Sequence, residues 1–219
     1  MIGIGVVLFA GFCAASPVPT AAAASAAPAA DTALARMWRQ AQTWAAFEAA
    51  IDARVELWRR NIRLAAVPDA LLARARGVGS WKLLVVADDD CSDSVNVLPY
   101  IAKLAELAPN LEIRIVPDGL GTSVKQAHRA PDGRPAIPTL VVLDAAFNDR
   151  GCWVERPAQL QHWFIQRGDS LLDHDTDTYR REKQGFYDFD RGLSTLEEVV
   201  GVIEAAAAGT PRCGIAPHP

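Results

Sequence analysis

Apolar residues recur at three- and four-residue steps through the first third of the chain, a spacing typical of helices. Between residues 31 and 63 they form one stripe: Leu34, Met37, Trp38, Ala41, Trp44, Ala45, Ile51, Val55, Trp58 and Ile62. A third short helix is expected at Asp69–Arg76, because Pro68 can open a helix and Gly77 can close one. Aromatic side chains at helical spacing are mostly core residues, so we interpret the tryptophans as packing rather than as a ligand-binding face.

After Gly79 the pattern changes to short apolar runs separated by helical stretches. The predicted strands are 82–87 (KLLVVA), 111–116 (LEIRIV), 139–144 (TLVVLD) and 152–156 (CWVER). Continuous apolar runs such as the first are typical of strands buried on both faces. Helices are predicted from the apolar positions between Val97 and Ala108, at 120–128 and at 157–166. The resulting order is strand, helix, strand, helix, hairpin, helix.

The last fifty residues are less regular. We interpret the acidic stretch Asp173–Asp177, with His174, as a solvated helix end or loop, and we predict no metal site and no cofactor for the chain. Ser194–Glu197 (STLE) fits a capping box that would open a final helix reaching Ala206. Residues 210–219 are expected to be frayed.

The N-terminus predicts export. Residues 1–15 are almost wholly apolar, and the following Ala/Pro/Ser/Thr stretch offers two small-residue cleavage sites, Ala22–Ala24 and Ala24–Ala26. A periplasmic or secreted protein is therefore expected, with a cytoplasmic one as the alternative if the segment is not a working signal. The apolar run is shorter than the roughly 20 residues that span a bilayer, so no stable membrane span is predicted.

Composition and charge change this picture little. The chain has 219 residues, of which 50% are hydrophobic and 22% charged, which is a balance that can bury a core. The formal net charge is −4, so the sequence lacks the basic excess that nucleic acid or an anionic membrane surface would attract. Four cysteines are too few for a disulfide scaffold, and each must be considered separately.

Cys91 is the main candidate for chemistry. It stands between a predicted buried strand and a predicted helix, where unpaired N–H groups and the helix dipole favour a thiolate, the nucleophilic form of cysteine. The carboxylates at Asp88–Asp90 and Asp93 act in the opposite direction, because like charges raise a thiol pKa. Spacing alone leaves open which influence is larger.

The surroundings of Cys91 resemble the thioredoxin superfamily. The resemblance rests on Cys-x-x-Ser at Cys91–Ser94, a proline eight residues on at Pro99, and an Ile-Pro step at Ile137–Pro138 before a strand. The stretches WKLLVVADDDCSDS, LPYIAKLAELAPNLEIRIV, GRPAIPTLVVLD and WVERPAQLQHWF are similar to a bacterial thioredoxin-like branch with a Trp-Cys-Gly-Asp-type motif.

The resemblance implies an α/β, thioredoxin-like fold with a helical extension at each end. The expected divisions are a signal peptide and low-complexity segment at 1–30, an N-terminal helical extension at 31–80, a thioredoxin-like domain at 81–167 and a C-terminal helical tail at 168–219. It also implies that Cys91 is the attacking cysteine and that Pro138 is cis and lies against it. Ile137 and Pro138 would then present their backbone to an extended substrate.

This sequence departs from the family pattern on both sides of Cys91. Asp90 replaces the usual aromatic residue, Ser92 and Asp93 fill the motif, and Ser94 occupies the position of the resolving cysteine. By the family topology Cys152 starts a strand far from the site, so we do not expect a Cys91–Cys152 disulfide. Cys213 lies in the tail, and a Cys152–Cys213 disulfide with Cys91 free stays open.

Three hypotheses follow for Cys91. In the first, it attacks a protein or small-molecule disulfide, Ser94 donates a hydrogen bond to the sulfur, and an external thiol resolves the adduct. In the second, the chain is a redox-inactive binding module that holds a peptide or partner beside Pro138. In the third, Cys91 is a small buried residue that only packs. The pKa of Cys91 distinguishes the first from the others.

Overall fold

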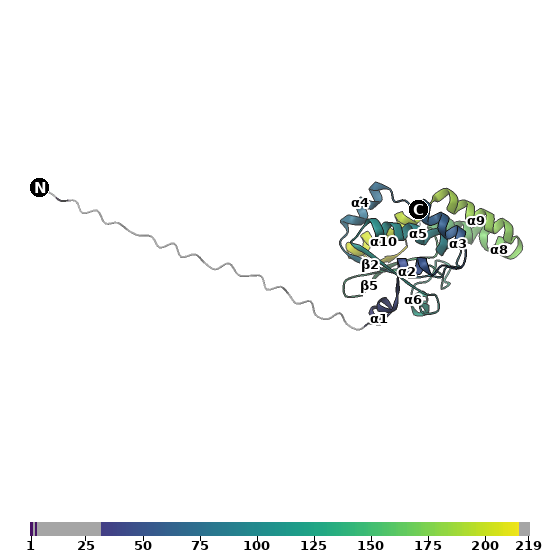
Figure 1. Cartoon of the computed structure of the whole chain (residues 1–219), viewed down its shortest axis with the longest axis horizontal. Helices are drawn as coiled ribbons and strands as arrows, with labels where there is room; N and C mark the ends of the chain where they lie inside the picture. Colours follow the sequence, from purple (N-terminus) through teal and green to yellow (C-terminus); the bar gives the residue numbers. More distant parts are fainter. Residues whose placement is uncertain (2, 4–31, 215–219) are drawn as a thin grey trace.

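The computed structural model describes residues 1, 3 and 32–214, and these residues form one mixed sheet with helices on both faces (Figure 1). The strands are β1 Gln42–Thr43, β2 Trp81–Val86, β3 Leu111–Val116, β4 Thr139–Leu143, β5 Asp149–Val154 and β6 Arg212–Cys213. Their order in the sheet is β1-β3-β2-β4-β5-β6. The pairs β2–β3 and β5–β6 are parallel, and β1–β3, β2–β4 and β4–β5 are antiparallel. The predicted signal peptide lies outside the described residues.

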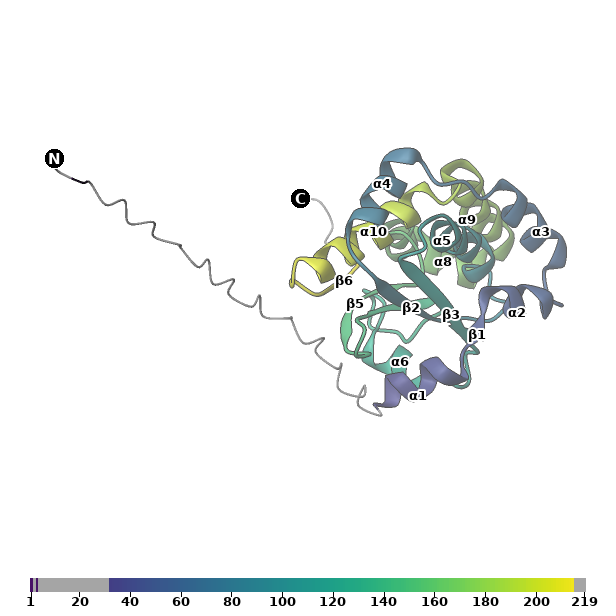
Figure 2. The same ribbon diagram turned by 60° about the vertical axis from the view of Figure 1, so that its left-hand side comes forward.

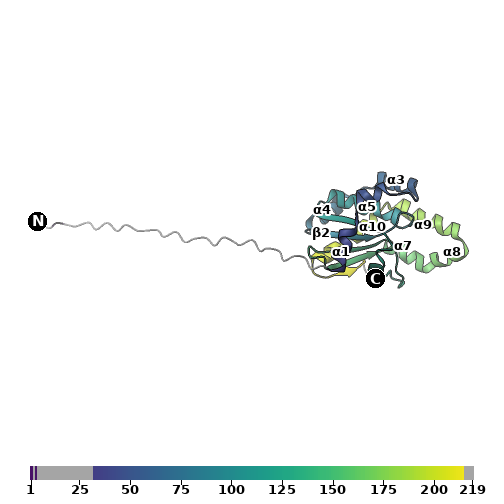
Figure 3. The same cartoon turned by 60° about the horizontal axis from the view of Figure 1, so that its bottom comes forward.

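Helices cover both faces of this sheet. They are α1 Ala33–Gln40, α2 Trp44–Ala49, α3 Val55–Leu64, α4 Asp69–Gly77, α5 Ser94–Leu107, α6 Thr122–Ala127, α7 Ala158–Trp163, α8 Asp169–His174, α9 Thr176–Asp190 and α10 Leu193–Ala207, with a π-helical turn at Phe164–Gly168. Figure 2 shows α1 and α6 on one face, and α3, α4, α5 and α10 on the other. The pair α8 and α9 projects beyond the sheet (Figure 3).

Alternation along the central strands assigns side chains to two cores. Leu83 and Val85 of β2 pack in the larger core with α5 and α10, whereas Leu84 and Val86 pack in the smaller core under α1. All four are fully buried. A continuous apolar run is therefore required, because successive side chains of a strand point to opposite faces and both faces are covered.

The predicted helical stripe at 31–63 is wrong in one respect. It is interrupted by β1, whose two residues pair with Ile115 and Arg114 of β3. This edge strand carries the chain from one face of the sheet to the other, so Trp38 packs in the smaller core and Trp58 in the larger one. A two-residue strand is too short to have a periodicity of its own, so the sequence pattern did not distinguish it from the flanking helices.

Two predictions for the C-terminal region are also wrong. Helix α10 begins at Leu193 after Gly192, and Ser194 does not cap it, because the backbone N–H and hydroxyl of Ser194 donate to Asp190 instead. The segment expected to be frayed contains β6, which pairs in parallel with β5. Cys213 on β6 forms a disulfide with Cys152 on β5.

Gly151 permits the close approach of β6 to β5. Its φ is +143°, and a Cβ at this position would lie 2.6 Å from the carbonyl oxygen of Arg212. No side chain fits in that space, so glycine is required where the two strands meet.

Among the described residues, none of the helices has the length and apolar character that a membrane span needs.

Candidate active site

Cys91 lies between β2 and α5, as the sequence predicted, and its side chain is partly buried. Its sulfur contacts backbone groups on two sides. The thiol donates to the carbonyl oxygen of Ile137 at 3.5 Å, and the backbone N–H of Ser94 donates to Sγ at 3.4 Å. The first contact holds the protonated thiol, and the second would stabilise the thiolate.

The loop before Cys91 is held by the N-terminal helices. One Asp89 carboxylate oxygen accepts from the backbone N–H groups of Asp52 and Ala53 at 2.8 and 2.9 Å. The Asp89 carbonyl accepts from Nε1 of Trp58 at 2.8 Å, and the exposed Asp90 accepts at its carbonyl from Arg54. The segment between α2 and α3 therefore positions the loop from which Cys91 projects. Sequence reasoning did not find this role for residues 52–58.

The Ile137–Pro138 peptide bond is cis, as the family resemblance implied. Ile137 and Pro138 enter β4 directly beside Cys91, and the hydroxyl of Thr139 donates to the carbonyl of Ala136 at 2.7 Å. The carbonyl of Pro138 accepts from the backbone N–H of Glu155 at 2.7 Å. The turn is thus fixed from both sides, with the Ile137 carbonyl facing the sulfur of Cys91.

Beneath Cys91 is a buried cluster of charged groups around Asp93. Its carboxylate accepts from Nζ of Lys183 at 2.7 Å, from Nη2 of Arg156 at 3.4 Å and from the hydroxyl of Tyr187 at 2.5 Å. Arg156 also pairs with Glu155. All five side chains are buried. Only Asp93 was predicted as a site residue; the other four come from the loop after β5 and from α9, and the sequence analysis assigned them no role in the site.

Electrostatics at this site favour the thiol over the thiolate. Burial raises the pKa of Cys91, and the Asp93 carboxylate raises it further. Contacts with Ser94 and with the backbone N–H of Asp93 lower the pKa but do not offset the increase. The pKa of Tyr187 is raised as well, first by burial and then by Asp93, so Tyr187 is a neutral donor to that carboxylate.

Comparisons with known proteins agree with this geometry. A family model described as thioredoxin matches residues 40–177, more than half of the chain. The chain belongs to the thioredoxin family. The match begins earlier and ends later than the predicted 81–167 domain: it includes β1, which pairs with β3, and it ends at the start of α9. No curated protein matches the sequence.

Two solved structures resemble this thioredoxin-family protein over most of its length. A protein of unknown function from Pseudomonas aeruginosa is 26% identical, covers 80% of this chain and 96% of its own, and has a TM-score of 0.56. An HIV epitope scaffold is 24% identical, covers 80% of this chain and 97% of its own, and has a TM-score of 0.55. The second likeness shows the fold alone.

Ser94 and Ser92 lie on different sides of the motif. The backbone N–H of Ser94 makes the hydrogen bond to the sulfur, and the buried Ser94 hydroxyl, which meets no described group at hydrogen-bond geometry, also lowers the pKa of Cys91. The Ser92 hydroxyl accepts from Nζ of Lys183 on α9 at 2.9 Å. Ser94 therefore contacts the Cys91 sulfur, whereas Ser92 contacts Lys183 of α9.

No second thiol is available to Cys91 among residues 32–214. Cys152 and Cys213 are bonded to each other, as the open alternative from the sequence allowed, and Cys91 is the free cysteine of the described residues. Cys13 lies outside them. An internal resolving step between Cys91 and a described cysteine would first require this disulfide to be broken.

A cleft of about 350 Å³ opens beside the motif, lined by α5, α8 and α9 and by Arg54 just before α3. Its polar lining includes Arg54, Ser92, Asn96, Arg180, Lys183 and Gln184. Three of these side chains are cationic and none is anionic. Lys183 pairs with the buried Asp93, whereas Arg180 forms only an exposed ion pair with Asp177 and Arg54 donates to the Asp90 carbonyl.

Proposed function

We propose that this protein is a monothiol thioredoxin-family protein that acts on disulfides or mixed disulfides through Cys91. The single observation that carries the proposal is the position of the Cys91 sulfur. It is partly exposed at the start of α5, it touches the cis Ile137–Pro138 turn, and Ser94 stands where a resolving cysteine would be. The likeness to the branch with a Trp-Cys-Gly-Asp-type motif stays part of this proposal.

The reaction consists of two exchanges. The Cys91 thiolate attacks one sulfur of a substrate disulfide, a new S–S bond forms, and the other substrate sulfur leaves as a thiolate that takes up a proton. An external thiol, as its thiolate, then attacks the substrate sulfur of the mixed disulfide; a new S–S bond forms between them, and Cys91 leaves as a thiolate. The backbone N–H of Ser94, which already donates to Sγ, stabilises the thiolate at both steps.

The raised pKa of Cys91 makes this a slow reagent at neutral pH. Only the thiolate attacks, and burial together with Asp93 keeps most of the thiol protonated. Once formed, the mixed disulfide lasts until an external thiol arrives. A protein with these two properties captures selected partners rather than reducing disulfides at large.

The cleft beside Ser92 favours an acidic partner. Arg54 and Arg180 line it, and their charge would attract carboxylates on the chain that carries the substrate disulfide. An acidic segment lying over α9 would place its cysteine near Cys91, because the cleft and the sulfur share the same end of α5. Neutral or basic partners would have no such electrostatic attraction to this surface.

We also propose that the protein is exported to the periplasm or secreted. The apolar N-terminus followed by small residues supports export, and the Cys152–Cys213 disulfide is of the kind that persists in oxidising compartments. N-terminal sequencing of the protein isolated from cells should begin between about residues 23 and 31. Soluble cytoplasmic protein that retains Met1 would contradict export.

A redox-inactive binding module is the second candidate, and one observation favours it. The thiol of Cys91 is protonated, half-covered and satisfied by the Ile137 carbonyl, which is how a cysteine that only packs would be held. In this case the turn at Pro138 and the cleft beside Ser92 would hold a peptide without exchange. The raised thiol pKa is compatible with this candidate.

Trapping distinguishes the two candidates. The full chain carrying Cys13→Ser is isolated from cells under alkylating, non-reducing conditions and searched for DTT-sensitive conjugates, with an added Cys91→Ser variant as control. Monothiol exchange predicts conjugates that disappear in the control. If Cys91 carries none, and is alkylated no faster than the same thiol in the denatured chain, the binding module is correct.

A further inference from the structure

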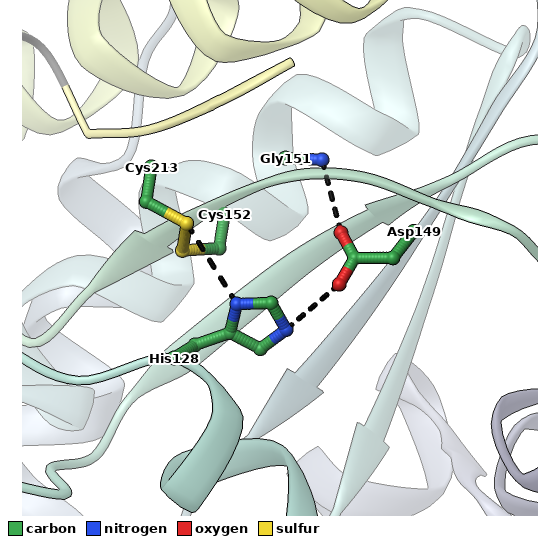
Figure 4. The surroundings of a disulfide bond; sticks show 5 residues. All are labelled: His128, Asp149, Gly151, Cys152 and Cys213. Atoms are coloured by element: carbon green, nitrogen blue, oxygen red, sulfur yellow. Dashed lines mark hydrogen bonds and ion pairs between the residues drawn. A yellow bond between two sulfur atoms is a disulfide. The ribbon is translucent and has the colours of Figure 1, made fainter.

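A second group of reactive side chains gathers around the paired strands β5 and β6 (Figure 4). His128 ends α6, and its Nδ1 is 3.7 Å from Sγ of Cys213. Its other nitrogen, Nε2, is 2.9 Å from a carboxylate oxygen of Asp149. The donor atoms of His128, Cys152 and Cys213 all lie within 4.8 Å of one another.

We propose that reduction of the Cys152–Cys213 disulfide converts this cluster into a Zn²⁺ site, with His128 Nδ1 and the two thiolates as ligands. In the oxidised state the two sulfurs are bonded to each other and bind no metal; in the reduced state both thiolates bind Zn²⁺. Nothing in this inference depends on the reactivity of Cys91.

The histidine already lies at a ligand distance. In a tetrahedral zinc site with Zn–S of about 2.3 Å and Zn–N of about 2.0–2.1 Å, a nitrogen and a sulfur ligand are about 3.6 Å apart. The separation between Nδ1 of His128 and Sγ of Cys213 is 3.7 Å. Only the two sulfurs must move, from about 2.0 Å in a disulfide to about 3.8 Å around the metal. Side-chain rotation on two adjacent strands can supply that change.

Asp149 orients the imidazole as zinc sites require. A histidine that binds zinc usually donates its other N–H to a carboxylate, which fixes the tautomer and the ring orientation. Here Nε2 faces Asp149, and this partner assigns the proton to Nε2, leaving the lone pair of Nδ1 directed at the sulfurs. The second oxygen of Asp149 accepts from the backbone N–H of Gly151 at 3.1 Å, so the carboxylate is itself held in place.

The site is accessible to a reductant and to the metal from the Cys213 side. Cys152 is fully buried, whereas Cys213 is exposed and lines a cavity of about 320 Å³ together with Gly214 and Arg129. With three protein ligands, the fourth tetrahedral position would face this opening. A water molecule or a side chain of a partner would complete the coordination there.

Formation of the site requires a dithiol reductant. Two electrons and two protons pass from the dithiol to the disulfide, which yields two cysteine thiols and the cyclic disulfide of the reductant. Zn²⁺ then displaces the two thiol protons and binds the thiolates. A disulfide that serves only to fasten β6 to β5 would break in the same way but would leave no strong zinc site.

The test uses the full chain with Cys13→Ser and Cys91→Ser, so that Cys152 and Cys213 are the remaining thiols. The protein is reduced with DTT, desalted without oxygen and titrated with Co²⁺, whose thiolate bonds give a near-ultraviolet charge-transfer band, and then with Zn²⁺. The reduced chain should bind one equivalent of either metal, and the disulfide form should bind none. Asp149→Asn should weaken zinc binding by about 10- to 100-fold.

His128→Ala is the decisive variant, and His174→Ala on the exposed end of α8 is its matched control. The proposal expects the first to lose at least about tenfold in affinity and the second to lose nothing. Equal binding by His128→Ala and the reduced parent, or equal binding by the reduced and disulfide forms, would overturn it. If reduction unfolds the chain, Zn²⁺ must restore the helical circular dichroism, and failure to do so would also overturn it.

Discussion

The carboxylate of Asp93 lies 2.7 Å from the ammonium group of Lys183, although 90 residues separate them in the chain. Through this pair α9 reaches the motif that contains Cys91, and both side chains are buried. Asp93 raises the pKa of the Cys91 thiol, and Lys183 forms an ion pair with the same carboxylate. The C-terminal region thus takes part in setting the charge around the candidate nucleophile.

Removing Lys183 should destabilise the fold. In Lys183→Met the Asp93 carboxylate stays buried with Tyr187 and a longer contact to Arg156, so an uncompensated charge is left. Breaking a buried ion pair from one side costs about 3–5 kcal/mol, and the remaining partners place the expected loss near the lower end. Urea denaturation followed by circular dichroism measures it.

Arg180→Met on the same helix is the matched control for Lys183→Met. Arg180 is exposed, and its ion pair with Asp177 is a surface pair, which contributes about 0–1 kcal/mol. Similar losses for the two variants would mean that the Asp93–Lys183 contact contributes no more than an exposed pair does.

Replacing Asp93 by asparagine should lower the pKa of Cys91. Burial, the larger cause of the raised value, is unchanged, but the like charge of Asp93 is removed while Lys183 and Arg156 stay in place. The thiolate fraction at neutral pH therefore increases. The pH dependence of iodoacetamide alkylation in a Cys13→Ser background should shift to lower pH for Asp93→Asn.

Asp90→Asn is the comparison for that experiment, because Asp90 is exposed and adjacent to Cys91 on the other side. Its removal should shift the alkylation profile less than removal of Asp93 does. An unchanged or higher Cys91 pKa in folded Asp93→Asn would show that the carboxylate does not destabilise the thiolate.

Ser94→Cys should convert the site from a monothiol to a dithiol. The backbone N–H of Ser94 is 3.4 Å from the Cys91 sulfur, and a cysteine here has the spacing that resolves mixed disulfides by internal attack. Conjugates at Cys91 should fall, and turnover of a disulfide substrate with DTT as the electron donor should rise. Conjugates that persist unchanged in Ser94→Cys would contradict the two-step scheme.

Ser94→Ala is the control for that variant. It supplies no second thiol, so conjugates should persist at the parent level. Because the buried Ser94 hydroxyl makes no hydrogen bond with a described group, its removal is expected to stabilise the fold by up to about 1 kcal/mol.

The sequence predicted the parts of the site that lie close together in the chain. The buried run of β2, the position of Cys91 before α5 and the cis bond at Pro138 follow from local pattern and the family resemblance. It did not predict the contacts of Asp93 with Lys183 and Tyr187, because polar residues on α9 have the spacing of an ordinary solvated helix. Only the packing of α9 against the motif shows that they are buried.

The same limit applies to the cysteines. Spacing left a Cys152–Cys213 disulfide as one alternative, since a tail cysteine can reach many places. The choice is made by β6, a strand of only two residues, which exists because Gly151 lets the backbone of Arg212 approach β5. His128 joins them from the C-terminal end of α6, and a lone histidine in the sequence does not predict this contact.

The last prediction concerns the pH dependence of stability through Glu198. This side chain of α10 is buried and accepts from Nε1 of Trp153 at 2.7 Å and from the backbone N–H of Ala158 at 2.8 Å. Burial raises the pKa of Glu198 above its ordinary value, and the two hydrogen bonds lower it only in part. The folded state therefore holds this proton more tightly than the unfolded state does.

A group whose pKa is raised on folding contributes stability below its unfolded pKa and loses that contribution as the pH rises through its folded pKa. The free energy of unfolding of Glu198→Gln, measured against the parent, should therefore improve as the pH rises from about 4 toward neutrality, since Gln has no proton to lose. Urea denaturation of both proteins across this range gives the difference directly. Glu197→Gln, at the adjacent exposed position, controls for the loss of one negative charge. A difference for Glu198→Gln that is flat with pH, or that grows less favourable, would show that Glu198 titrates alike in the folded and unfolded chains.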